Sequence, residues 1–418
     1  MTDPGRPARI EASVACAFVG LLDTEDRSGD NAAYSPAGAQ FQECLLRALS
    51  ATELDVTHVY ALRPVPSFPT RRLVYTARQD KLADSVPATL IGFVNLGPVK
   101  TITGGLTLFP RLFAWAWRER ARKRVILLYN LYSPPGIVSV VAGWLTRSKT
   151  VAIVADLQIP GQGLLPDTVM RRLDFALQRL SLPHFDGLIV LTNRMAEDFA
   201  PDVPRIQMEG AAPDSVLVDS PPGQRDTDRG GKFIIMYAGG LSQLKGIDRL
   251  LQAFALLEGD HFRLRVTGVG PLADVVARAA AADSRIQYFG FTGDDELRSL
   301  YRDADVLVNP HSIRHASARY LFPSKLIEYL ATGTPVISTC STPEIADEYS
   351  EFLFATLDDS AEAIAATLRN VAQLPSAERT ARGVAARRFI LANKSWAAQA
   401  RRIAKFVCDD SGAREGNQ

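Results

Sequence analysis

The sequence predicts an α/β protein made of two doubly wound domains that face each other across a cleft. Three observations support this. The chain has 418 residues and is 47% hydrophobic, which is too long for one ordinary core. Short apolar, β-branched segments alternate with helical patterns, as in βαβ units with parallel sheets. Residues 213–231 are rich in Pro, Gly and Asp and lack any hydrophobic period, which is typical of a linker.

These observations divide the chain into an N-terminal domain, 1–212, and a C-terminal domain, 232–375, both Rossmann-like. The helical stretch 376–408 is expected to pack back on the N-terminal domain. The polar tail, 409–418, is expected to be disordered.

The first half of the chain shows the alternation less cleanly than the second. A strand is predicted at 12–20 and a helix at 37–49, and a further helix at 166–182 precedes a late strand. The other strands are predicted from apolar, β-branched composition at 56–63, 73–76, 88–97, 125–130, 149–157 and 186–192.

The second half alternates strictly, which favours a parallel, doubly wound sheet. Its strands are predicted at 233–240, 262–268, 286–290, 305–310, 335–339 and 352–357. Its helices are predicted at 247–257, 272–281, 294–304, 324–332, 341–349 and 360–374.

Composition excludes several classes of protein. A net charge of +1 does not suggest a nucleic-acid binder held by bulk charge. The four scattered cysteines favour reduced thiols, and His311 and His315 lack the acidic partner that a metal motif would supply. The apolar run 13–22 is interpreted as a first buried strand, because no small-residue cleavage site follows it. No apolar run has the roughly 18 residues that a spanning helix needs.

Four loops of the second half follow predicted strands and hold unusual residues. In a doubly wound sheet, ligands bind beyond the carboxyl ends of the strands. The candidate residues are Gly239, Gly240 and Lys245 in the first loop; Gly268, Gly270 and Pro271 in the second; Phe289, Gly290 and Phe291 in the third; and Tyr320, Ser324, Lys325 and Glu328 around the fourth. Glycines permit close backbone approach, and an ammonium before a helix suits a diphosphate.

The polar side of the helix after Pro323 has two possible interpretations. Ser324, Lys325 and Glu328 share one side at the helix start, where unpaired N–H groups attract anions. An exposed Lys–Glu pair of little energetic weight explains the same pattern equally well.

The second loop imitates a dinucleotide-binding fingerprint, but it follows the second strand of its domain and has no acidic residue at the next strand's end.

Taken in order, these loops resemble the nucleotide-sugar domain of glycosyltransferase family 4, retaining enzymes of the GT-B fold. The segments AGGLSQLKGIDRLLQAF, TGVGPL, FGFT and FPSKLIEYLATGTPVIST carry the resemblance over about 120 residues. They are similar to the FPSK-containing branch of bacterial surface-polysaccharide glycosyltransferases. The N-terminal domain resembles the family only in its alternation and in the AGAQ segment that includes Gly38.

The resemblance implies a role for each matching residue. Lys245 would bind the donor diphosphate, and Glu328 would hydrogen-bond the nucleotide ribose. The loops around Gly268 and Phe289 would border the base, while backbone amides near Ser324 would face phosphate or sugar. The family further implies retaining sugar transfer from a nucleotide-diphosphate sugar, with no metal and no other cofactor required.

Two positions depart from the family pattern. Gly240 stands where an arginine is frequent, and Tyr320 stands where a glutamate is frequent, eight positions before Glu328. Both departures concern the diphosphate and the transferred sugar. They keep two alternatives open beside the glycosyltransferase: a GT-B nucleotide-sugar epimerase, and a non-catalytic scaffold subunit that binds nucleotide sugars.

The acceptor side is expected in the N-terminal domain, near Gly38, Asn130 and Asp156. The acceptor implied is a saccharide, free or linked to a polyprenyl diphosphate. The segment 106–124 is apolar and aromatic and then basic, with six basic residues and one acidic residue from Arg111 to Arg124. It predicts either a surface helix on anionic lipid or an ordinary core helix with a charged end. We expect a cytoplasmic protein that binds no nucleic acid, and the first of these two alternatives would place it at the inner face of the cell membrane.

Overall fold

The computed structural model describes residues 14–23, 35–83, 86–155, 157, 159, 168–213, 231–315 and 317–409. Most of the predicted linker, the tail from residue 410 onward and Asp156 lie outside these residues. The chain divides into two compact units, each described below by itself. Unit 1 comprises Met1–Met208 and Trp396–Gln418, and unit 2 comprises Glu209–Ser395.

This division differs from the predicted one at the C-terminal helices. The stretch 376–408 was expected to pack as a whole on the N-terminal domain. The structure has two helices there, α13 (Ser376–Asn393) in unit 2 and α14 (Trp396–Cys408) in unit 1. Gly383 of α13 explains the difference, because a Cβ built there would lie 2.0 Å from the Gly333 carbonyl oxygen. Glycine thus permits α13 to lie directly on the backbone of unit 2.

Unit 1 contains an eight-stranded sheet in the order β10-β9-β8-β7-β1-β2-β5-β4. All neighbouring strands pair in parallel except β4 and β5, so the antiparallel strand lies at one edge. The bounds are β1 Val14–Leu21, β2 Leu54–Leu62, β4 Arg78–Leu82, β5 Val86–Leu90, β7 Lys123–Tyr129, β8 Lys149–Val154, β9 Gly187–Val190 and β10 Arg205–Gln207.

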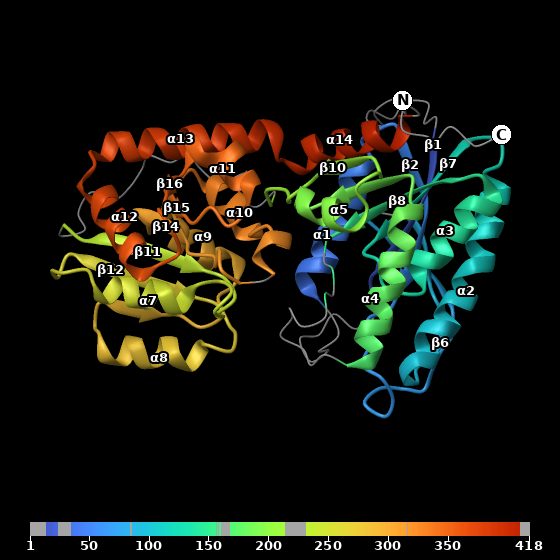
Figure 1. Ribbon diagram of the computed structural model, residues 1–418, viewed down its shortest axis with the longest axis horizontal. Helices are drawn as coiled ribbons and strands as arrows, with labels where there is room; N and C mark the ends of the chain where they lie inside the picture. The colour runs from blue at the N-terminus through green and yellow to red at the C-terminus, as the bar shows by residue number, and fades with distance from the viewer. Residues whose placement is uncertain are drawn as a thin grey trace, which may run out of the picture. The chain divides into compact units, whose positions relative to one another are not determined.

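Helices flank both faces of this sheet (Figure 1), which explains why its central strands are apolar throughout. Helix α1 packs on α14, and α2 packs on α3, which in turn packs on α4. The bounds are α1 Pro36–Leu49, α2 Gly97–Arg118, α3 Pro135–Thr146, α4 Val169–Ser181 and α5 Asn193–Phe199, with a short 3-10 helix η1 at Leu182–His184.

The predicted strand 88–97 is two strands in the structure. Its first part belongs to β5, while β6 (Phe93–Val94) pairs with β3 (Val74–Tyr75) in a separate two-stranded sheet. Gly92 lies between them, and a Cβ there would be 2.7 Å from the backbone nitrogen of Ala77. This close approach lets the chain change sheets, which an apolar run cannot reveal.

Unit 2 contains a six-stranded, fully parallel sheet in the order β13-β12-β11-β14-β15-β16. Its strands are those predicted from the alternation of the second half. The bounds are β11 Phe233–Ala238, β12 Phe262–Thr267, β13 Ile286–Tyr288, β14 Val306–Asn309, β15 Val336–Ser338 and β16 Phe354–Ala355.

Buried apolar residues of β11, β12, α7, α8 and α12 form one core cluster on one face of this sheet. On the other side, α10 packs against α13 (Figure 1). The bounds are α7 Ile247–Ala255, α8 Ala273–Ala282, α9 Asp294–Asp303, α10 Ser324–Thr332, α11 Pro343–Tyr349 and α12 Ala361–Gln373, with 3-10 helices η2 Ala318–Tyr320 and η3 Ser350–Phe352. Because every connection is a crossover, all carboxyl ends of the strands lie at one edge of the sheet.

Candidate functional site

The strand order of unit 2 reverses between β11 and β14, since β12 and β13 continue on one side and β15 and β16 on the other. Such a switch point is where ligands bind in open α/β sheets, beyond the carboxyl ends of the strands. The loop 239–246 follows β11, and the loop 310–323 follows β14. The first and fourth predicted loops therefore flank the switch point.

The first three loops are joined to one another by backbone hydrogen bonds. The amide of Leu241 donates to the carbonyl of Val269 at 2.9 Å, and the amide of Gly268 donates to the carbonyl of Gly290 at 2.7 Å. A Cβ at Gly268 would lie 1.8 Å from the Gly239 carbonyl oxygen. The glycines predicted to approach a ligand thus first allow the loops to approach each other.

Lys245 lies at the end of the loop after β11, one residue before Gly246. Gly246 has a φ of +75°, and a Cβ there would be 1.7 Å from the carbonyl oxygen of Pro310, so this loop lies directly against the loop after β14. Burial lowers the pKa of Lys245. No ion pair of its ammonium is found among the described residues, whereas Arg249, Arg314 and Lys325 of the same unit each have a carboxylate partner.

His311 lies beside Lys245 at the start of the loop after β14. Its side chain is fully buried, and its Nε2 has no hydrogen-bond partner in the described part of the chain. Burial, together with the nearby cations of Lys245 and Arg249, lowers the pKa of His311 to about 3. The imidazole is therefore neutral at pH 7, and a buried nitrogen without a partner calls for a ligand atom or a water.

Asp359 holds the same loop in place through hydrogen bonds and an ion pair. Its carboxylate accepts hydrogen bonds from the Ser312 hydroxyl and the Ile313 amide, each at 3.2 Å. It also forms ion pairs with Arg249 at 3.7 Å and with Arg314 at 3.1 Å. These two guanidinium groups are thus held by the protein, and the ammonium of Lys245 is the cation next to them without such a partner.

Helix α10 presents its polar side as predicted. The Lys325 ammonium lies 2.9 and 2.8 Å from the two carboxylate oxygens of Glu328, and the Tyr301 hydroxyl donates to Oε1 of Glu328 at 2.9 Å. Ser324 is exposed at the first position of the helix. The Lys–Glu pair therefore exists, and it uses two of the three N–H donors of the Lys325 ammonium.

Tyr320 and Tyr329 are both buried, but they differ in role. The Tyr329 hydroxyl lies 2.7 Å from both the amide and the carbonyl of Ala238, so it holds α10 against the end of β11. Tyr320 is 4% exposed in η2, and the Arg319 guanidinium lies 4.7 Å from its ring centroid. The structure thus places the predicted donor residue Tyr320 in the interior of the unit.

The aromatic residues of the third loop are open to solvent, with Phe289 36% and Phe291 80% exposed. Gly290 between them has a φ of +66°, a conformation that favours glycine. Pro271 in the second loop is exposed as well. These side chains are available to border a ligand, because the hydrogen bonds that join the loops involve the backbone.

In unit 1, Gly38 and Asn130 lie at the corresponding switch point, between β1 and β7. A Cβ at Gly38 would be 3.4 Å from the hydroxyl of Tyr129, the residue before Asn130. Asn130 is 5% exposed, and its Oδ1 accepts from the Ala155 amide at 3.0 Å. That side chain therefore supports the end of β8, while Asp156 lies outside the described residues.

Some of the basic side chains after residue 110 already have partners within the protein. Arg122 pairs with Asp55 at 3.0 Å, and Arg124 donates to the carbonyls of Ala116 and Thr146 at 2.7 and 2.8 Å. Predicted helix 106–124 is α2, which ends at Arg118 and buries only part of its surface. None of the helices in the described ranges combines the length and hydropathy needed to cross a bilayer.

The described residues contain no group of three or more His, Cys, Asp or Glu side chains placed to hold a metal ion. Sequence reasoning singled out His311 only as half of a weak metal pair, and it missed Tyr301 and Tyr329. The buried position of His311 after an apolar strand was the available signal. The two tyrosines occur in ordinary helical patterns, which do not distinguish a core side chain from one beside a site.

Comparison with known proteins gives a family match over the part of the chain that contains the candidate site. Residues 232–373 match the family model described as "Glycosyl transferases group 1". An uncharacterized glycosyltransferase of Methanocaldococcus jannaschii is 31% identical over 108 residues, which is 25% of this chain and 26% of that protein. A putative colanic acid biosynthesis glycosyltransferase, WcaL, of Salmonella typhimurium is 28% identical over 142 residues, or 32% of this chain and 34% of that protein. The chain thus matches about a quarter to a third of the length of these relatives.

Solved structures are similar over nearly the whole chain. Sucrose-phosphate synthase from Thermosynechococcus elongatus has a TM-score of 0.63 at 17% identity, covering 94% of this chain and 98% of that one. HepE of Anabaena, in complex with UDP, has a TM-score of 0.61 at 12% identity, covering 94% and 99%. A further HepE structure contains UDP-glucose. At these identities the similarity confirms the predicted fold, a GT-B arrangement of parallel α/β sheets.

Proposed function

We propose that this chain is a retaining glycosyltransferase of family 4, in its FPSK-containing branch. It would transfer a sugar, a hexose or an N-acetylhexosamine, from a nucleotide-diphosphate sugar to a saccharide acceptor. The match of residues 232–373 to the group 1 glycosyl transferases supports the class. HepE, whose solved complexes contain UDP and UDP-glucose, has the same fold and supports the choice of donor.

The observation that supports the proposal best is the environment of Lys245. Its ammonium is half-buried at the switch point of the sheet, without a carboxylate partner among the described residues, and it lies beside the neutral His311. A cation held in this way is suited to a diphosphate, which supplies the missing negative charge. His311 Nε2 would then hydrogen-bond the same ligand.

The proposed reaction follows from this charge arrangement. The bond between the anomeric carbon and the diphosphate oxygen breaks, and the anomeric carbon forms a new bond to the acceptor oxygen on the same face. The acceptor's hydroxyl proton passes to an oxygen of the leaving diphosphate. Lys245 and the amides at the start of α10 would stabilise the charge that gathers on that diphosphate. Glu328 would hold the ribose, and no metal or further cofactor takes part.

The proposed acceptor is a saccharide, free or carried on a polyprenyl diphosphate, in the synthesis of a surface polysaccharide. The Salmonella relative, named for colanic acid biosynthesis, supports the pathway. The proposed location is cytoplasmic, at the inner face of the membrane. Exposed apolar residues of α2, such as Leu106 at 69% and Trp117 at 64%, support contact with lipid.

One observation favours a second candidate, a non-catalytic subunit that binds nucleotide sugars. Lys325 could have supplied the charge missing at Gly240, but Glu328 already engages it. Tyr320, at the position of a frequent glutamate, is buried. An epimerase would share the donor site and differ in using no acceptor.

Thermal unfolding with UDP, GDP, ADP, CMP and dTDP at millimolar concentration tests the donor site. A ligand at about 100 times its Kd stabilises the protein by roughly 2.7 kcal/mol, so one nucleotide should raise Tm by several degrees. Lys245→Ala should abolish that shift, whereas Lys232→Ala, at the opposite ends of the strands, should leave it intact. Equal shifts in both variants would exclude the proposed diphosphate site.

Sugar transfer is then measured with the selected donor and a mixture of saccharide acceptors. Transfer by the wild-type protein that Lys245→Ala reduces by about two to three orders of magnitude supports the transferase, a loss typical of one removed charge-stabilising group. Nucleotide binding without any transfer or epimerisation would favour the scaffold subunit.

A further inference from the structure

Unit 1 contains a pocket that has no part in the proposed reaction. It has a volume of about 640 Å³ and lies between α2 and strands β2, β5 and β4. Its walls include none of the candidate acceptor residues and no acidic side chain. The lining residues are His58, Tyr60, Gln79, Thr89, Arg111, Phe113, Ala114, Trp117 and Arg118. The volume is within the range of sites that hold small molecules.

The sheet side of this pocket is polar where a packed core would be apolar. Thr89 of β5 is the register partner of both Tyr60 of β2 and Gln79 of β4, so the three form one row across three strands. The ring of His58 lies 2.8 Å from the Thr89 hydroxyl, which donates to Gln79 at 3.2 Å. Val59 and Ala61 of the same strand are fully buried and apolar. Polar groups thus line this pocket where an ordinary core would be apolar.

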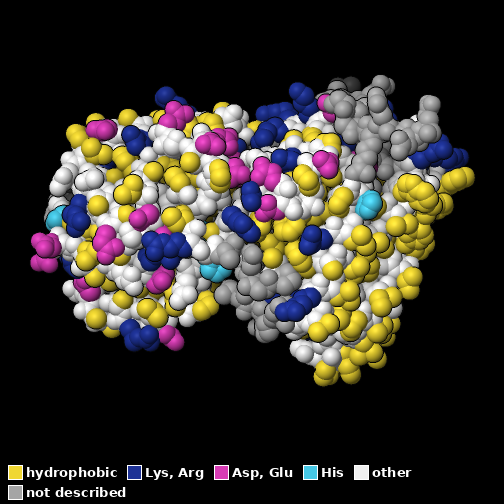
Figure 2. Space-filling model, in the orientation of Figure 1, with side chains coloured by type: hydrophobic (Ala, Val, Ile, Leu, Met, Phe, Trp, Pro, Cys, Tyr) yellow, Lys and Arg dark blue, Asp and Glu magenta, His cyan; other side chains and the backbone are white. Residues whose placement is uncertain are grey.

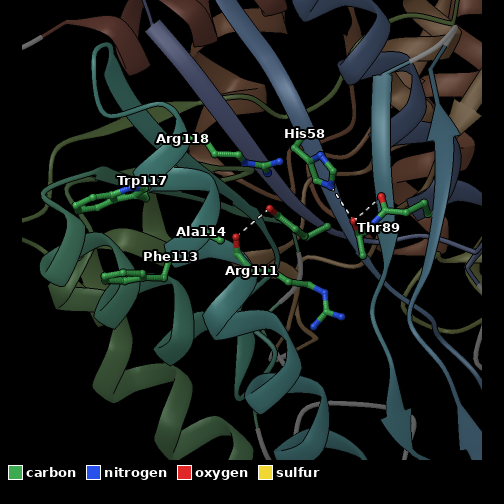
Figure 3. A pocket seen from close by; sticks show the side chains of 9 residues that line it. His58, Thr89, Arg111, Phe113, Ala114, Trp117 and Arg118 are labelled. Atoms are coloured by element: carbon green, nitrogen blue, oxygen red, sulfur yellow. Dashed lines mark hydrogen bonds between the residues drawn. The ribbon is translucent and has the colours of Figure 1, made fainter.

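The helix side of the pocket supplies two guanidinium groups. Arg111 and Arg118 extend from α2 toward the strands that carry His58 and Thr89 (Figure 3). Arg111 donates to the Thr107 carbonyl at 2.5 Å, and within the described residues neither guanidinium has a carboxylate partner. Arg122, one turn later, pairs with Asp55. Two cations that share a pocket without any acid favour an anion between them, and guanidinium binds phosphate with two parallel hydrogen bonds.

The outer side of α2 is apolar. Phe113 is 43% and Trp117 64% exposed, and both lie away from the strands in Figure 3. Trp144 on the adjacent α3 is 78% exposed, and apolar side chains gather over α2, α3 and α4 in Figure 2. Aromatic side chains of this kind are enriched where protein meets the lipid headgroups. The ligand should therefore combine an anionic head with an apolar remainder.

We propose that this pocket binds the phosphate headgroup of an anionic phospholipid, with Arg111 and Arg118 on either side of the phosphate and the acyl chains outside α2. This would be a defined lipid site in unit 1, in addition to any general attraction between basic side chains and the membrane. The inference does not depend on the proposed sugar transfer, because its measure is lipid binding.

The test compares binding of the full chain to vesicles of phosphatidylcholine alone and of phosphatidylcholine with about 30% phosphatidylglycerol. Removing both cations, in Arg111→Gln/Arg118→Gln, should lower binding to the anionic vesicles about 30-fold or more. The matched control Arg120→Gln/Arg147→Gln removes two exposed cations at the ends of α2 and α3, outside the pocket, and should change binding only a few-fold. Equal losses in the two variants would overturn the proposal in favour of general charge attraction.

A second variant keeps the charges and closes the pocket. Ala114 lines it and is exposed, so Ala114→Phe should fill the space without disturbing the core. We expect this variant to lose the preference for phosphatidylglycerol while keeping the Tm of the wild type. A retained preference would contradict the pocket.

Glycerol 3-phosphate at millimolar concentration distinguishes the two sources of a phosphate. If it stabilises the wild type against heat but not Arg111→Gln/Arg118→Gln, and vesicles show no phosphatidylglycerol preference, the ligand is a soluble phosphate and the lipid proposal is wrong. A vesicle preference that the two pocket variants lose would support it.

Discussion

The two units use the same kind of sheet but differ in what stabilises their carboxyl edges. In unit 2, backbone hydrogen bonds join three loops, and Gly268 permits the close approach of two of them. Lys245 in the first loop has no carboxylate partner in the described part of the chain. In unit 1, Asn130 at the equivalent edge is used to support β8. Its unusual residues lie instead beneath α2, near Arg111 and Arg118. Backbone contacts thus define the geometry of the candidate site in unit 2, while side chains line the pocket beneath α2 in unit 1.

The largest expected effect is on the glycine contacts of unit 2. Gly268→Ala places a Cβ 1.8 Å from the Gly239 carbonyl oxygen, at a φ of +139°, and should destabilise the unit by about 3 kcal/mol or more. Gly104→Ala in α2 of unit 1, where nothing lies within 4 Å of the new Cβ, should instead stabilise by about 0.5–1 kcal/mol. Calorimetry measures the Tm of both variants. A similar change in Tm for Gly268→Ala and Gly104→Ala would contradict this difference between the units.

A pH effect should come next in size. Burial holds the pKa of His311 at about 3, below the 6.5 of an unfolded chain, so the unfolded state binds the extra proton as pH falls. Stability is therefore full above about pH 6.5 and decreases toward lower pH, by about 2 kcal/mol at pH 5 for this group. The facing charges are Lys245, Arg249 and His315.

Urea unfolding of the wild type and of His311→Gln at pH 7 and pH 5 measures this effect. Titration of the other groups is common to the two proteins and cancels in their difference. The variant should lose less stability than the wild type over this range. Parallel losses would mean that His311 is not buried as described.

A smaller effect is expected at Glu328, which the proposal assigns to the ribose. Glu328→Gln removes one charge-assisted hydrogen bond and should weaken nucleotide binding about tenfold, or about 1.4 kcal/mol. Its partly exposed pair with Lys325 should add little to Tm. Calorimetric titration with the selected nucleotide tests this, with Glu296→Gln, an exposed residue of α9, as the control. Unchanged affinity in the Glu328 variant would remove that residue from the site.

The smallest effect concerns the basic segment of unit 1. Arg122→Gln breaks half-exposed ion pairs with Asp55 and Glu119 at 3.0 and 3.4 Å and should cost less than about 1 kcal/mol. Because that guanidinium is already paired, binding to anionic vesicles should hardly change. A loss as large as that of the pocket variant would show that the whole segment acts by charge alone.

The sequence revealed unit 2 well because its strands, helices and glycine loops are consecutive and each leaves a local pattern. It revealed less of unit 1. The strand β4 is polar and lies at an edge, α3 was not predicted, and the chain changes sheets at Gly92. The position of Lys245 in a loop after a strand could be predicted, whereas the burial of His311 could not, because burial of a single histidine depends on tertiary packing. The division between α13 and α14 was missed for the same reason, since it depends on the contact at Gly383.

The glycine contacts also restrict how this chain can diverge. In a library that samples every amino acid, Gly246 and Gly268 should return glycine alone, since a Cβ at either would meet a carbonyl oxygen within 2 Å. Gly290, with a φ of +66° and open space around it, should accept Asn and Asp as well. Neighbouring side chains such as Phe289 and Phe291 protrude from the same loop and can vary freely. If these loops bind the proposed nucleotide sugar, selection can exchange the side chains around it, and with them the preferred nucleotide, on a backbone that stays the same.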